Sequence, residues 1–367
     1  MAAEPTRPRI AVVFGGRSGE HQISCLTARS VLDAIDHSRY EVIPIGIAPD
    51  GRWVLAESGP AELPAGQLPS VDGSGDEVVL ADSRLRVSGS SEVPHAFGKV
   101  DAVFPLLHGP WGEDGTIQGL FEMAGVRYVG AGVLSSAVAM DKAYANIVFS
   151  AAGLPQLPHV VVRAREWKED RAAVRESIAS LGMPVFVKPA RAGSSMGASL
   201  VHDDAALDAA VAAAQQNDPK FIVEAAAVGA REIECGVIES PDGPPEASVT
   251  GEIRIDAAAG HEFYDFEAKY LDGSSETVVP ADVPEQVSET IRSLAVEAFE
   301  ALGCEGLARV DFFLLPDGQV LINELNTMPG FTPYSLFPRM WAESGLDYPA
   351  LVERLIELAL RRDTGLR

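Results

Sequence analysis

The sequence predicts an α/β protein that begins with a doubly wound parallel sheet and continues into α+β units. Over the first third of the chain, apolar runs alternate with helical segments, as they do in parallel α/β sheets. Beyond residue 130 this alternation gives way to strand–loop–strand patterns. The length of 367 residues also exceeds what one hydrophobic core usually serves. We therefore expect three domains, at 1–130, 131–230 and 231–367.

In the first domain, predicted strands alternate with predicted helices. The run RIAVVFG at 9–15 is almost continuously apolar, which is typical of a strand covered on both faces. A stretch rich in glycine, proline and serine at 57–76 is predicted as a surface excursion. The predicted strands are 9–15, 41–48 and 99–109, and the predicted helices are 22–36 and 114–125.

The other two domains mix helices with antiparallel-looking strands. In the central domain we expect helices at 132–152, 171–181 and 204–216, strands at 159–163, 184–188, 198–201 and 220–228, and a Gly/Ser-rich loop at 192–197. In the last domain we expect strands at 231–239, 246–255, 307–315 and 319–324, a helix at 284–302, and a helical end. Pro316-Asp317-Gly318 is a strong turn signal, so the last two strands should form a hairpin.

Composition narrows the class of protein. Acidic residues outnumber basic ones by 53 to 29, and the net charge of −24 argues against nucleic acid and anionic membranes as partners. No stretch is long and apolar enough to cross a bilayer, and the N-terminus has no signal-peptide pattern, so we expect a cytosolic protein. Cys25, Cys235 and Cys304 form no zinc spacing and are expected to be buried thiols.

Two glycine-containing segments are candidates for ligand binding, although the common nucleotide motifs G-x-G-x-x-G and G-x-x-x-x-G-K-[ST] are absent from the sequence. Gly15-Gly16 follows the first strand, where open α/β sheets bind ligands, but an ordinary tight turn fits equally. Lys188 ends a strand and precedes the loop PARAGSSMG, whose backbone N–H groups can wrap phosphate oxygens. A glycine-rich hairpin with a surface lysine is the alternative.

Two predicted neighbouring strands carry a candidate metal site. Alternation puts Arg309 and Asp311 on one face, and likewise Glu324 and Asn326. Two carboxylates and an amide would converge, a set that suits Mg²⁺ shared with nucleotide phosphates, and the arginine could stabilise a phosphoryl group in transfer. Pairing of Arg309 with Glu324 is the alternative, but the apolar flanks make an unliganded acidic cluster costly.

Two further features have less specific signals. The loop at 260–276 carries Lys269 and Tyr270 and shows no regular period, so we predict a lid, with a disordered insertion as the alternative. His108 follows a predicted strand, where it could orient a substrate or simply cap the turn.

Taken together, these segments resemble the ATP-grasp superfamily and, within it, the D-alanine–D-alanine ligase family. The similarity spans nearly the whole chain, and HGPWGEDG, EAKY and NELNTMPG are specific to this family. The resemblance implies a Rossmann-like, pre-ATP-grasp substrate domain followed by a two-lobed α+β ATP-grasp fold. The segments that carry it are FGGRSGEHQIS, PLLHGPWGEDGTIQG, MDKAYAN, FVKPARAGSSMG, FYDFEAKY, GLARVDFF and INELNTMPGFTPYSLFP.

The resemblance also implies an ADP-forming carboxylate–amine ligase of peptidoglycan synthesis, and thus of cell-wall biogenesis and cell shape. One D-alanine carboxylate would attack the γ-phosphate of ATP, and the amine of a second D-alanine would then displace phosphate from the D-alanyl phosphate. ATP and two Mg²⁺ ions, with Mn²⁺ able to substitute, are the implied cofactors. The family also implies a homodimer formed through the N-terminal domain.

The family's functional residues carry over position by position. Those implied to act on the amino acids and the intermediate are Glu20 and His108 at the first D-alanine, Ser194 and Tyr270 beside Glu20, Arg309 and the Gly330 N–H at the tetrahedral intermediate, and Ser335 and the Leu336 N–H at the second carboxylate. Those implied to bind ATP are Lys142, Lys188 and Lys269 at the phosphates, Glu224 and the backbone of Ala227 at adenine, and Glu232 at the ribose. Those implied to bind the two Mg²⁺ ions are Asp311, Glu324 and Asn326.

Two positions depart from the family pattern. Alanines at 225–227 follow Glu224 where many members have a lysine and a bulkier residue, so the roles of Ala227 and Glu232 depend on a register that could be shifted. Gln22 stands where glutamate is expected, which removes a charge near the first substrate.

Three alternatives remain beside D-alanyl-D-alanine formation. A D-alanine–D-lactate or D-alanine–D-serine ligase would share the fold, but Tyr270 in the lid favours an amine as the second substrate. The NTMPG and GEDG segments count against another ATP-grasp ligase. A non-catalytic nucleotide-binding regulator would be expected to lose at least one charged residue of the phosphate and metal sites, and none is lost. We also expect the loops at 191–197 and 260–276 to close together on ATP.

Overall fold

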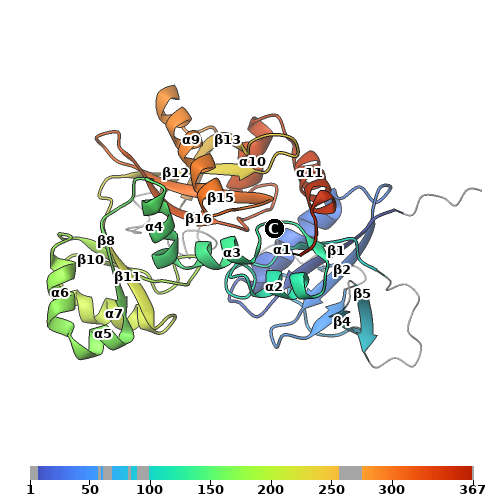
Figure 1. The fold of residues 1–367 in the computed structure, drawn as a ribbon, viewed down its shortest axis with the longest axis horizontal. Helices are drawn as coiled ribbons and strands as arrows, with labels where there is room; N and C mark the ends of the chain where they lie inside the picture. Colours follow the sequence, from blue (N-terminus) through green and yellow to red (C-terminus); the bar gives the residue numbers. More distant parts are fainter. Residues whose placement is uncertain are drawn as a thin grey trace, which may run out of the picture.

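The computed structural model describes most of the chain, arranged around three β-sheets. Figure 1 shows the four-stranded sheet at one end of the long axis, the N-terminal sheet at the other, and the five-stranded sheet between them. The α/β class predicted from the sequence is confirmed. The described residues are 7–56, 59–60, 68–81, 84–88, 99–255 and 275–365.

The N-terminal sheet has seven strands in the order β5-β4-β3-β2-β1-β6-β7. β1 runs parallel to β2 and β6, and β6 runs parallel to β7, with α1 and α2 in the connections. This is the predicted doubly wound arrangement. β3, β4 and β5 add an antiparallel edge that the sequence analysis did not predict, because short edge strands beside glycine-rich loops have weak patterns. The elements are β1 (Arg9–Gly15), α1 (His21–Ala34), β2 (Glu41–Ile47), β3 (Trp53–Leu55), β4 (Glu77–Ala81), β5 (Arg84–Ser88), β6 (Ala102–Pro105), α2 (Thr116–Met123) and β7 (Arg127–Tyr128).

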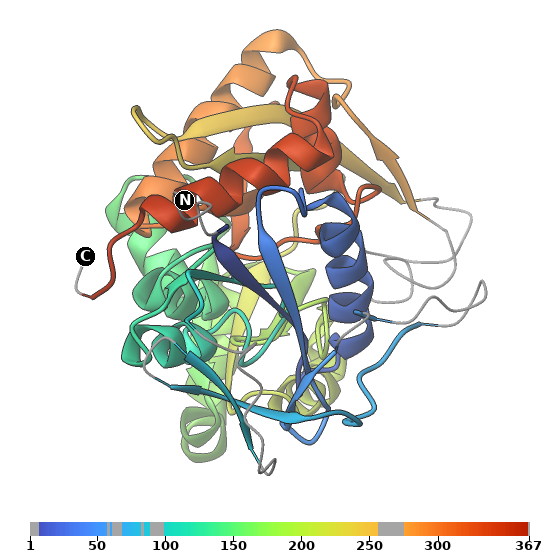
Figure 2. The ribbon, with the colours of Figure 1, turned by 90° about the vertical axis from the view of Figure 1, so that its right-hand side faces the viewer.

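The last helix of the chain packs on this first sheet. α11 (Tyr348–Arg361) contacts α1, β6 and β7, and Figure 2 shows it as the red helix lying against the blue strands. Leu351 and Leu355 on its apolar face are buried in one cluster with Ile10 of β1 and Phe104 of β6. Since each such side chain contributes about 1.5–3 kcal/mol on burial, the two ends of the chain stabilise each other here.

The segment after β7 forms two helices rather than the single helix predicted at 132–152. α3 (Val133–Met140) ends and α4 (Lys142–Ala151) begins at Asp141, whose backbone is extended at φ −96° and ψ 96°. The Asp141 side chain accepts the backbone N–H of Tyr144 and so caps α4. The sequence pattern does not predict this break because apolar residues continue through both helices.

The four-stranded sheet is antiparallel and has the order β10-β9-β11-β8. Its helices cover one face, where Val187 and Phe221 are buried. Alternation turns Phe186 and Lys188 of β9 to the other face. The predicted strands are confirmed to within a few residues, and α5 is an addition. The elements are β8 (His159–Arg163), α5 (Ala164–Glu169), α6 (Arg171–Ala179), β9 (Val185–Pro189), β10 (Ser199–Val201), the 3₁₀ helix η1 (Asp204–Ala206), α7 (Leu207–Gln215) and β11 (Lys220–Ala225).

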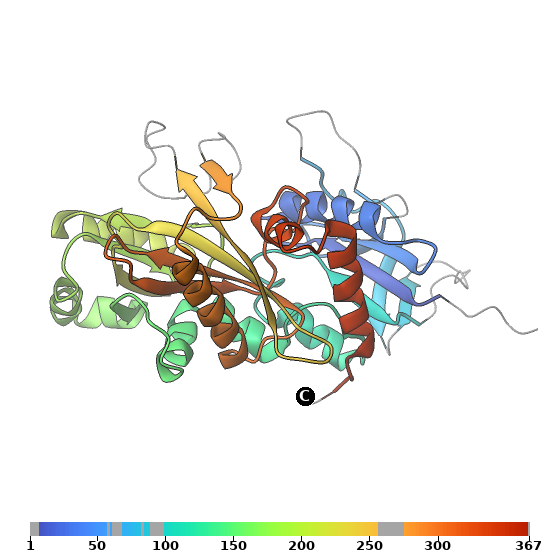
Figure 3. The same ribbon diagram turned by 90° about the horizontal axis from the view of Figure 1, so that it is seen from above.

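The five-stranded sheet is also antiparallel, in the order β14-β13-β12-β15-β16. Figure 3 shows α9 along one face of it and α10 and α11 between it and the first sheet. The predicted turn is confirmed, since Leu315 N–H donates to Gln319 O at 2.9 Å and Gly318 has φ 89°. β16 continues two residues beyond the prediction. The elements are β12 (Arg231–Ile238), β13 (Glu246–Ile255), β14 (Ser275–Val278), α9 (Glu285–Ala301), β15 (Leu307–Leu314), β16 (Val320–Asn326) and α10 (Leu336–Glu343).

Within these described ranges, no helix has the length and apolar character needed to span a membrane. The three cysteines are buried thiols, as predicted.

Candidate active site

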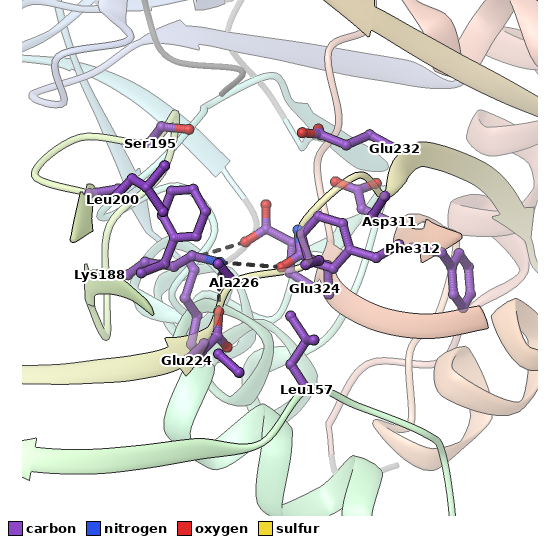
Figure 4. A pocket seen from close by; sticks show the side chains of 18 of the residues that line it. Leu157, Lys188, Ser195, Leu200, Glu224, Ala226, Glu232, Asp311, Phe312 and Glu324 are labelled. Atoms are coloured by element: carbon purple, nitrogen blue, oxygen red, sulfur yellow. Dashed lines mark hydrogen bonds and ion pairs between the residues drawn. The ribbon is translucent and has the colours of Figure 1, made fainter. Parts of the chain in front are cut away.

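A cavity of about 550 Å³ lies between the four-stranded and five-stranded sheets. Its walls come from the face of β9, β10 and β11 that the helices leave uncovered and from β12, β15 and β16. Figure 4 shows side chains from both sheets pointing into it. Small-molecule sites commonly have this size. The predicted site residues that line the cavity are Lys142, Lys188, Ser194, Glu224, Ala227, Glu232, Arg309, Asp311 and Glu324.

Lys188 reaches the cavity from near the end of β9. Its Nζ lies 2.6 Å from Oε2 of Glu224 and donates to Oδ1 of Asn323 at 3.5 Å. Burial alone would lower the pKa of Lys188, but the carboxylates of Glu224, Glu324 and Glu232 outweigh burial and raise it. The lysine is therefore a fixed positive charge on the cavity wall.

Lys142 supplies a second ammonium group from the first position of α4. Its Nζ lies 3.1 Å from Oε2 of Glu324 and donates to the Ala192 carbonyl at 3.1 Å. Its backbone N–H donates to the Ala190 carbonyl at 2.9 Å. Lys142 thus ties the loop after β9 to β16, and together with Lys188 it makes this wall suitable for phosphate oxygens.

The hairpin of β15 and β16 brings together the four residues that alternation placed on one face. The register pairs Arg309 with Asn326 and Asp311 with Glu324. Nδ2 of Asn326 donates to Oδ2 of Asp311 at 2.9 Å. Two carboxylates, an amide and a guanidinium therefore converge on the cavity side of the sheet.

This donor set fits a divalent cation. Asp311, Glu324 and Asn326 offer carboxylate and amide oxygens, which are the ligands that Mg²⁺ prefers. Among the residues that the structure describes, no group of three or more His, Cys, Asp or Glu side chains forms a metal site by itself. Oxygens of a bound phosphate would therefore have to complete the coordination, as is usual for Mg²⁺ that arrives with a nucleotide.

Arg309 is a partly buried cation among carboxylates. Its Nε and Nη2 donate to the two oxygens of Asp311, each at 2.7 Å, and Nε lies 3.0 Å from Oε2 of Glu234. Burial would lower the pKa of the guanidinium, but Asp311, Glu234 and Glu324 raise it well above its usual value. Arg309 is therefore charged at any pH at which the protein folds, and its planar fork suits a phosphoryl group.

Another part of the cavity wall is apolar. Phe186, Leu200 and Phe313 come from β9, β10 and β15. Flat apolar surfaces of this kind accommodate an aromatic base. The predicted nucleotide contacts in this region are Glu224 at the end of β11, Ala227 in the turn that follows, and Glu232 near the start of β12.

The turn after β1 sets the position of Glu20. Gly15 and Gly16 have φ of 89° and 95°, in the left-handed region that favours glycine, and a Cβ on Gly15 would collide with the Ile47 carbonyl. Gly16 N–H donates to that same carbonyl at 2.8 Å. The two glycines thus form the tight turn that the sequence left as one of two possibilities, and this turn leads to Glu20 at the start of α1.

Glu20, at the start of α1, contacts Ser194 in the loop that follows β9. Ser194 Oγ donates to Oε1 of Glu20. Ser194 and Ser195 have φ of 49° and 58°, a conformation that residues other than glycine adopt infrequently, and this conformation turns the loop toward α1. A Cβ on Gly109 would lie 2.5 Å from Oε2 of Glu20, so glycine at 109 permits the close approach.

His108 is buried with both ring nitrogens beside protein groups. Nδ1 lies 3.1 Å from the Met328 carbonyl, and Nε2 lies 3.3 Å from Oγ1 of Thr27. Burial lowers the pKa of His108, although Glu20 and the Met328 carbonyl act in the opposite direction. A neutral imidazole thus joins the loop after β6 to the segment after β16.

That segment carries Gly330, Ser335 and Leu336. The Ser335 hydroxyl accepts the Thr332 N–H at 3.2 Å and lies 2.8 Å from Oγ1 of Thr332. A Cβ on Gly330 would lie 3.2 Å from Oγ of Ser335, so the two residues are adjacent. Leu336 begins α10, and the first N–H groups of a helix have no intrahelical acceptor and favour an anion.

Lys269 and Tyr270 lie outside the described residues, as does nearly all of the loop at 260–276. β13 and β14 flank this loop in the five-stranded sheet. The lid therefore stays a prediction.

Three acidic residues near the site are not among those predicted from the sequence. Glu113 accepts the Gly109 N–H at 3.0 Å, and burial raises its pKa well above the usual value. Asp218 accepts Nε and Nη2 of Arg191, each at 2.9 Å, and so anchors the start of the loop after β9. Glu113 lies within the segment HGPWGEDG, but no role was assigned to it there, whereas Asp218 belongs to no motif and is brought to the site by tertiary contacts.

Glu234 is the third of these residues, and a pattern in the sequence could have identified it. Glu232 and Glu234 are two residues apart on a predicted strand, so alternation already put both on one face. Both line the cavity.

Comparison with known proteins gives matches over most of the chain. Residues 9–131 match the family model described as D-ala D-ala ligase N-terminus, and residues 148–357 match the one described as D-ala D-ala ligase C-terminus. A D-alanine–D-alanine ligase of Arthrobacter sp. (strain FB24) is 55% identical over 98% of this chain and 96% of its own length.

Two solved structures are also similar over nearly their full length. The VanG D-Ala:D-Ser ligase from Enterococcus faecalis has a TM-score of 0.82 and 34% identity, covering 96% of this chain and 100% of that one. The D-alanine-D-alanine ligase from Coxiella burnetii has a TM-score of 0.80 and 32% identity, covering 97% and 94%. The sequence matches and the shared fold agree, and the chain belongs to the D-alanine–D-alanine ligase family.

Proposed function

We propose that this protein is an ATP-dependent ligase that forms D-alanyl-D-alanine for peptidoglycan precursor synthesis. One observation carries the proposal: a single cavity combines two ammonium groups, a guanidinium and an oxygen-only donor set. These are the groups that transfer of a phosphoryl group from ATP to a carboxylate requires. The name of the Arthrobacter relative supports the choice of D-alanine.

ATP binds, in this proposal, with its base against the apolar wall and its phosphates toward Lys142 and Lys188. Glu224 and the backbone of Ala227 take the adenine, and Glu232 takes the ribose. The 2.6 Å ion pair between Lys188 and Glu224 supports this arrangement, because it ties the base end of the site to the phosphate end.

We assign two Mg²⁺ ions to Asp311, Glu324 and Asn326, with Mn²⁺ able to substitute. Bound there, the ions would neutralise charge on the phosphates of ATP. The convergence of these three side chains on the β15–β16 hairpin supports the assignment.

The first step takes place between Glu20 and Arg309. Glu20 receives the ammonium group of the first D-alanine, while Ser194 and the neutral His108 keep that carboxylate and the adjoining loop in place. A carboxylate oxygen of this D-alanine attacks the γ-phosphorus, and the bond to the β–γ bridging oxygen breaks. ADP and D-alanyl phosphate result, with Arg309 offsetting the charge on the phosphoryl group.

The second step uses the segment after β16. The amine of the second D-alanine attacks the carbonyl of D-alanyl phosphate, the bond from that carbon to the phosphate oxygen breaks, and the proton lost by nitrogen leaves with inorganic phosphate. Arg309 and the Gly330 N–H stabilise the oxyanion. Ser335 and the Leu336 N–H hold the second carboxylate, and the position of Leu336 in the first turn of α10 supports this role.

Two residues outside the described ranges complete the proposed site. Tyr270 joins Glu20 and Ser194, and Lys269 reaches the γ-phosphate. The loops at 191–197 and 260–276 close together when ATP binds. Limited proteolysis with and without nucleotide tests the closure, since protection of both loops is expected and unchanged cleavage would contradict it.

We also infer a cytosolic homodimer that forms through the N-terminal domain, within a chain divided at 1–130, 131–230 and 231–367. Leu120 and Met123 of α2 are 40% and 91% exposed, and Leu134 of the adjoining α3, at the start of the central domain, is 75% exposed. Apolar side chains gathered on adjacent helices are typical of an interface. A mass of twice 38.9 kDa in light scattering is the expected result.

A second candidate is a ligase of the same fold that takes D-serine or D-lactate in the second position. The D-serine version is favoured by one observation, the 34% identity and TM-score of 0.82 to a D-Ala:D-Ser ligase. The 55% identity to a relative named D-alanine–D-alanine ligase keeps D-alanine as the first choice.

The test is phosphate release from ATP and Mg²⁺, with products identified by mass spectrometry across pH. The additions are D-alanine alone, L-alanine alone, and D-alanine with excess D-serine or D-lactate. We expect D-alanyl-D-alanine at neutral pH and no turnover of L-alanine. Mixed dipeptide or depsipeptide as the main product would favour the second candidate, and absence of D-alanine-dependent phosphate release would refute both.

A further inference from the structure

A buried carboxylate beside the phosphate site has no role in the reaction described above. Glu234 on β12 is 4% exposed and lines the cavity. The register between β12 and β15 sets Glu234 opposite Asp311 and Gly236 opposite Arg309. Residues opposite each other on antiparallel strands share a sheet face. Glu234 therefore faces the two residues that the proposed function uses for phosphoryl transfer and metal binding.

Glu234, Arg309 and Asp311 form one compact group of charges. The guanidinium donates from Nε and Nη2 to Asp311 at 2.7 Å, while its Nε lies 3.0 Å from Oε2 of Glu234. Arg309 thus lies against two carboxylates at once. Both carboxylates raise its pKa, in opposition to burial.

Asp311 faces two demands that compete. Under the proposed function it is a metal ligand, yet in the structure both of its oxygens accept hydrogen bonds from Arg309, and Oδ2 also accepts one from Asn326. A bidentate arginine is a strong partner for a carboxylate. A cation at Asp311 therefore competes with Arg309 for the lone pairs and charge of this carboxylate.

A second carboxylate close to Arg309 allows the guanidinium to keep a partner when Asp311 binds a cation. A buried guanidinium that loses its partner is strongly destabilised, because its charge is left without compensation. Glu234 is already 3.0 Å from Nε and approaches from the neighbouring strand, so Arg309 can stay paired and in place when Asp311 turns to a cation.

We propose that Glu234 is a positioning residue that retains the Arg309 guanidinium so that Asp311 can bind the metal. This inference rests on the metal site assigned under the proposed function. It predicts that loss of the Glu234 charge strengthens the hold of Arg309 on Asp311 and weakens cation binding, without weakening metal-independent binding of the nucleotide.

The experiment measures Mn²⁺ binding to the enzyme–ADP complex without amino acid, by electron paramagnetic resonance of the unbound ion. Glu234→Gln keeps the size of the side chain and removes its charge. We expect its Kd for Mn²⁺ to rise about tenfold, which corresponds to roughly 1.4 kcal/mol. The Kd for ADP in the presence of a chelator should stay at the wild-type value.

A matched control comes from the next strand of the same sheet. Glu252 on β13 is 3% exposed and accepts Nε and Nη2 of Arg231 at 2.6 and 2.9 Å, but it does not line the cavity. Glu252→Gln therefore also breaks a buried ion pair, and we expect unchanged Mn²⁺ affinity. Glu234→Asp retains the charge one methylene farther back, so its Mn²⁺ affinity should lie between those of the wild type and Glu234→Gln.

The outcomes separate this inference from the proposed function. Wild-type Mn²⁺ affinity in both Glu234 variants would overturn the role of Glu234 and leave the metal site standing. A parallel loss of ADP affinity in chelator would also overturn it, because Glu234 would then shape the cavity as a whole. Absence of ADP-dependent Mn²⁺ binding in the wild type would remove the metal site itself, and this inference with it.

Discussion

The candidate site has two halves that are built in different ways. The phosphate half consists of Lys142, Lys188 and the face of the β15–β16 hairpin, where cations and carboxylates pair directly. The amino-acid half consists of Glu20, His108, Ser194 and the 330–336 segment. Its contacts join residues 174 positions apart, from Ser194 to Glu20, and 220 positions apart, from His108 to Met328.

The two halves should respond differently to amino-acid substitutions. The phosphate half lies on the β15–β16 hairpin of one sheet, on the β9–β11 pair of another and at the start of α4, and local hydrogen bonds fix the geometry within each of these parts. The amino-acid half depends on how the N-terminal sheet is placed against the loops of the four-stranded and five-stranded sheets. We therefore expect substitutions within the phosphate half to impair its chemistry, and changes in distant packing to alter the geometry of the amino-acid half.

The largest effect is expected at the centre of the phosphate half. Arg309→Lys keeps one charge but loses the planar fork that contacts Asp311, so kcat should fall about 10²- to 10³-fold. Steady-state kinetics measures the loss, and an unchanged thermal unfolding midpoint is the control. A kcat within tenfold of the wild type would show that the fork is dispensable.

The next effect tests whether the amino-acid half depends on distant packing. Leu355→Ala on α11 leaves a cavity against the first sheet and should lower the free energy of unfolding by about 3 kcal/mol. Urea unfolding measures the loss. We also expect the KM for D-alanine to rise while the affinity for ADP is retained, and an equal change in both would mean that the two halves are not separate.

A direct change in the amino-acid half should have a somewhat smaller effect. Glu20→Gln removes the carboxylate charge that accepts Ser194 and would meet the substrate ammonium, so kcat/KM for the first D-alanine should fall about 10²-fold. Isothermal titration with ADP should detect no change. Comparable losses for ADP and D-alanine would contradict the separation of the two halves.

The smallest effect is expected at the loop that joins the two halves. Asp218→Asn weakens the hydrogen bonds that hold the backbone N–H and the guanidinium of Arg191 at the start of the loop after β9. The KM for ATP should rise roughly fivefold, or about 1 kcal/mol, with little change in kcat. Asp203→Asn, at the exposed cap of η1, is the control and should leave the KM unchanged.

Much of the phosphate half could be predicted from the sequence for a physical reason. Strand alternation and the Pro316-Asp317-Gly318 turn act over a few residues, and together they already placed Arg309 and Asp311 beside Glu324. The break at Asp141 was not predicted, because it depends on a side-chain cap within a continuous apolar pattern. The pairing of Glu234 with Arg309 was not predicted either, since it required knowing which strands are neighbours.

The order of strands and helices, the hairpin and its converging side chains follow from local rules of backbone geometry and alternation, and so they are present in the sequence itself. The contact of Ser194 with Glu20, the burial of His108 and the packing of α11 on the first sheet depend on contacts between segments far apart in the chain. No local pattern encodes such contacts, because they arise when separate apolar faces find a common core. Only the folded chain decides them.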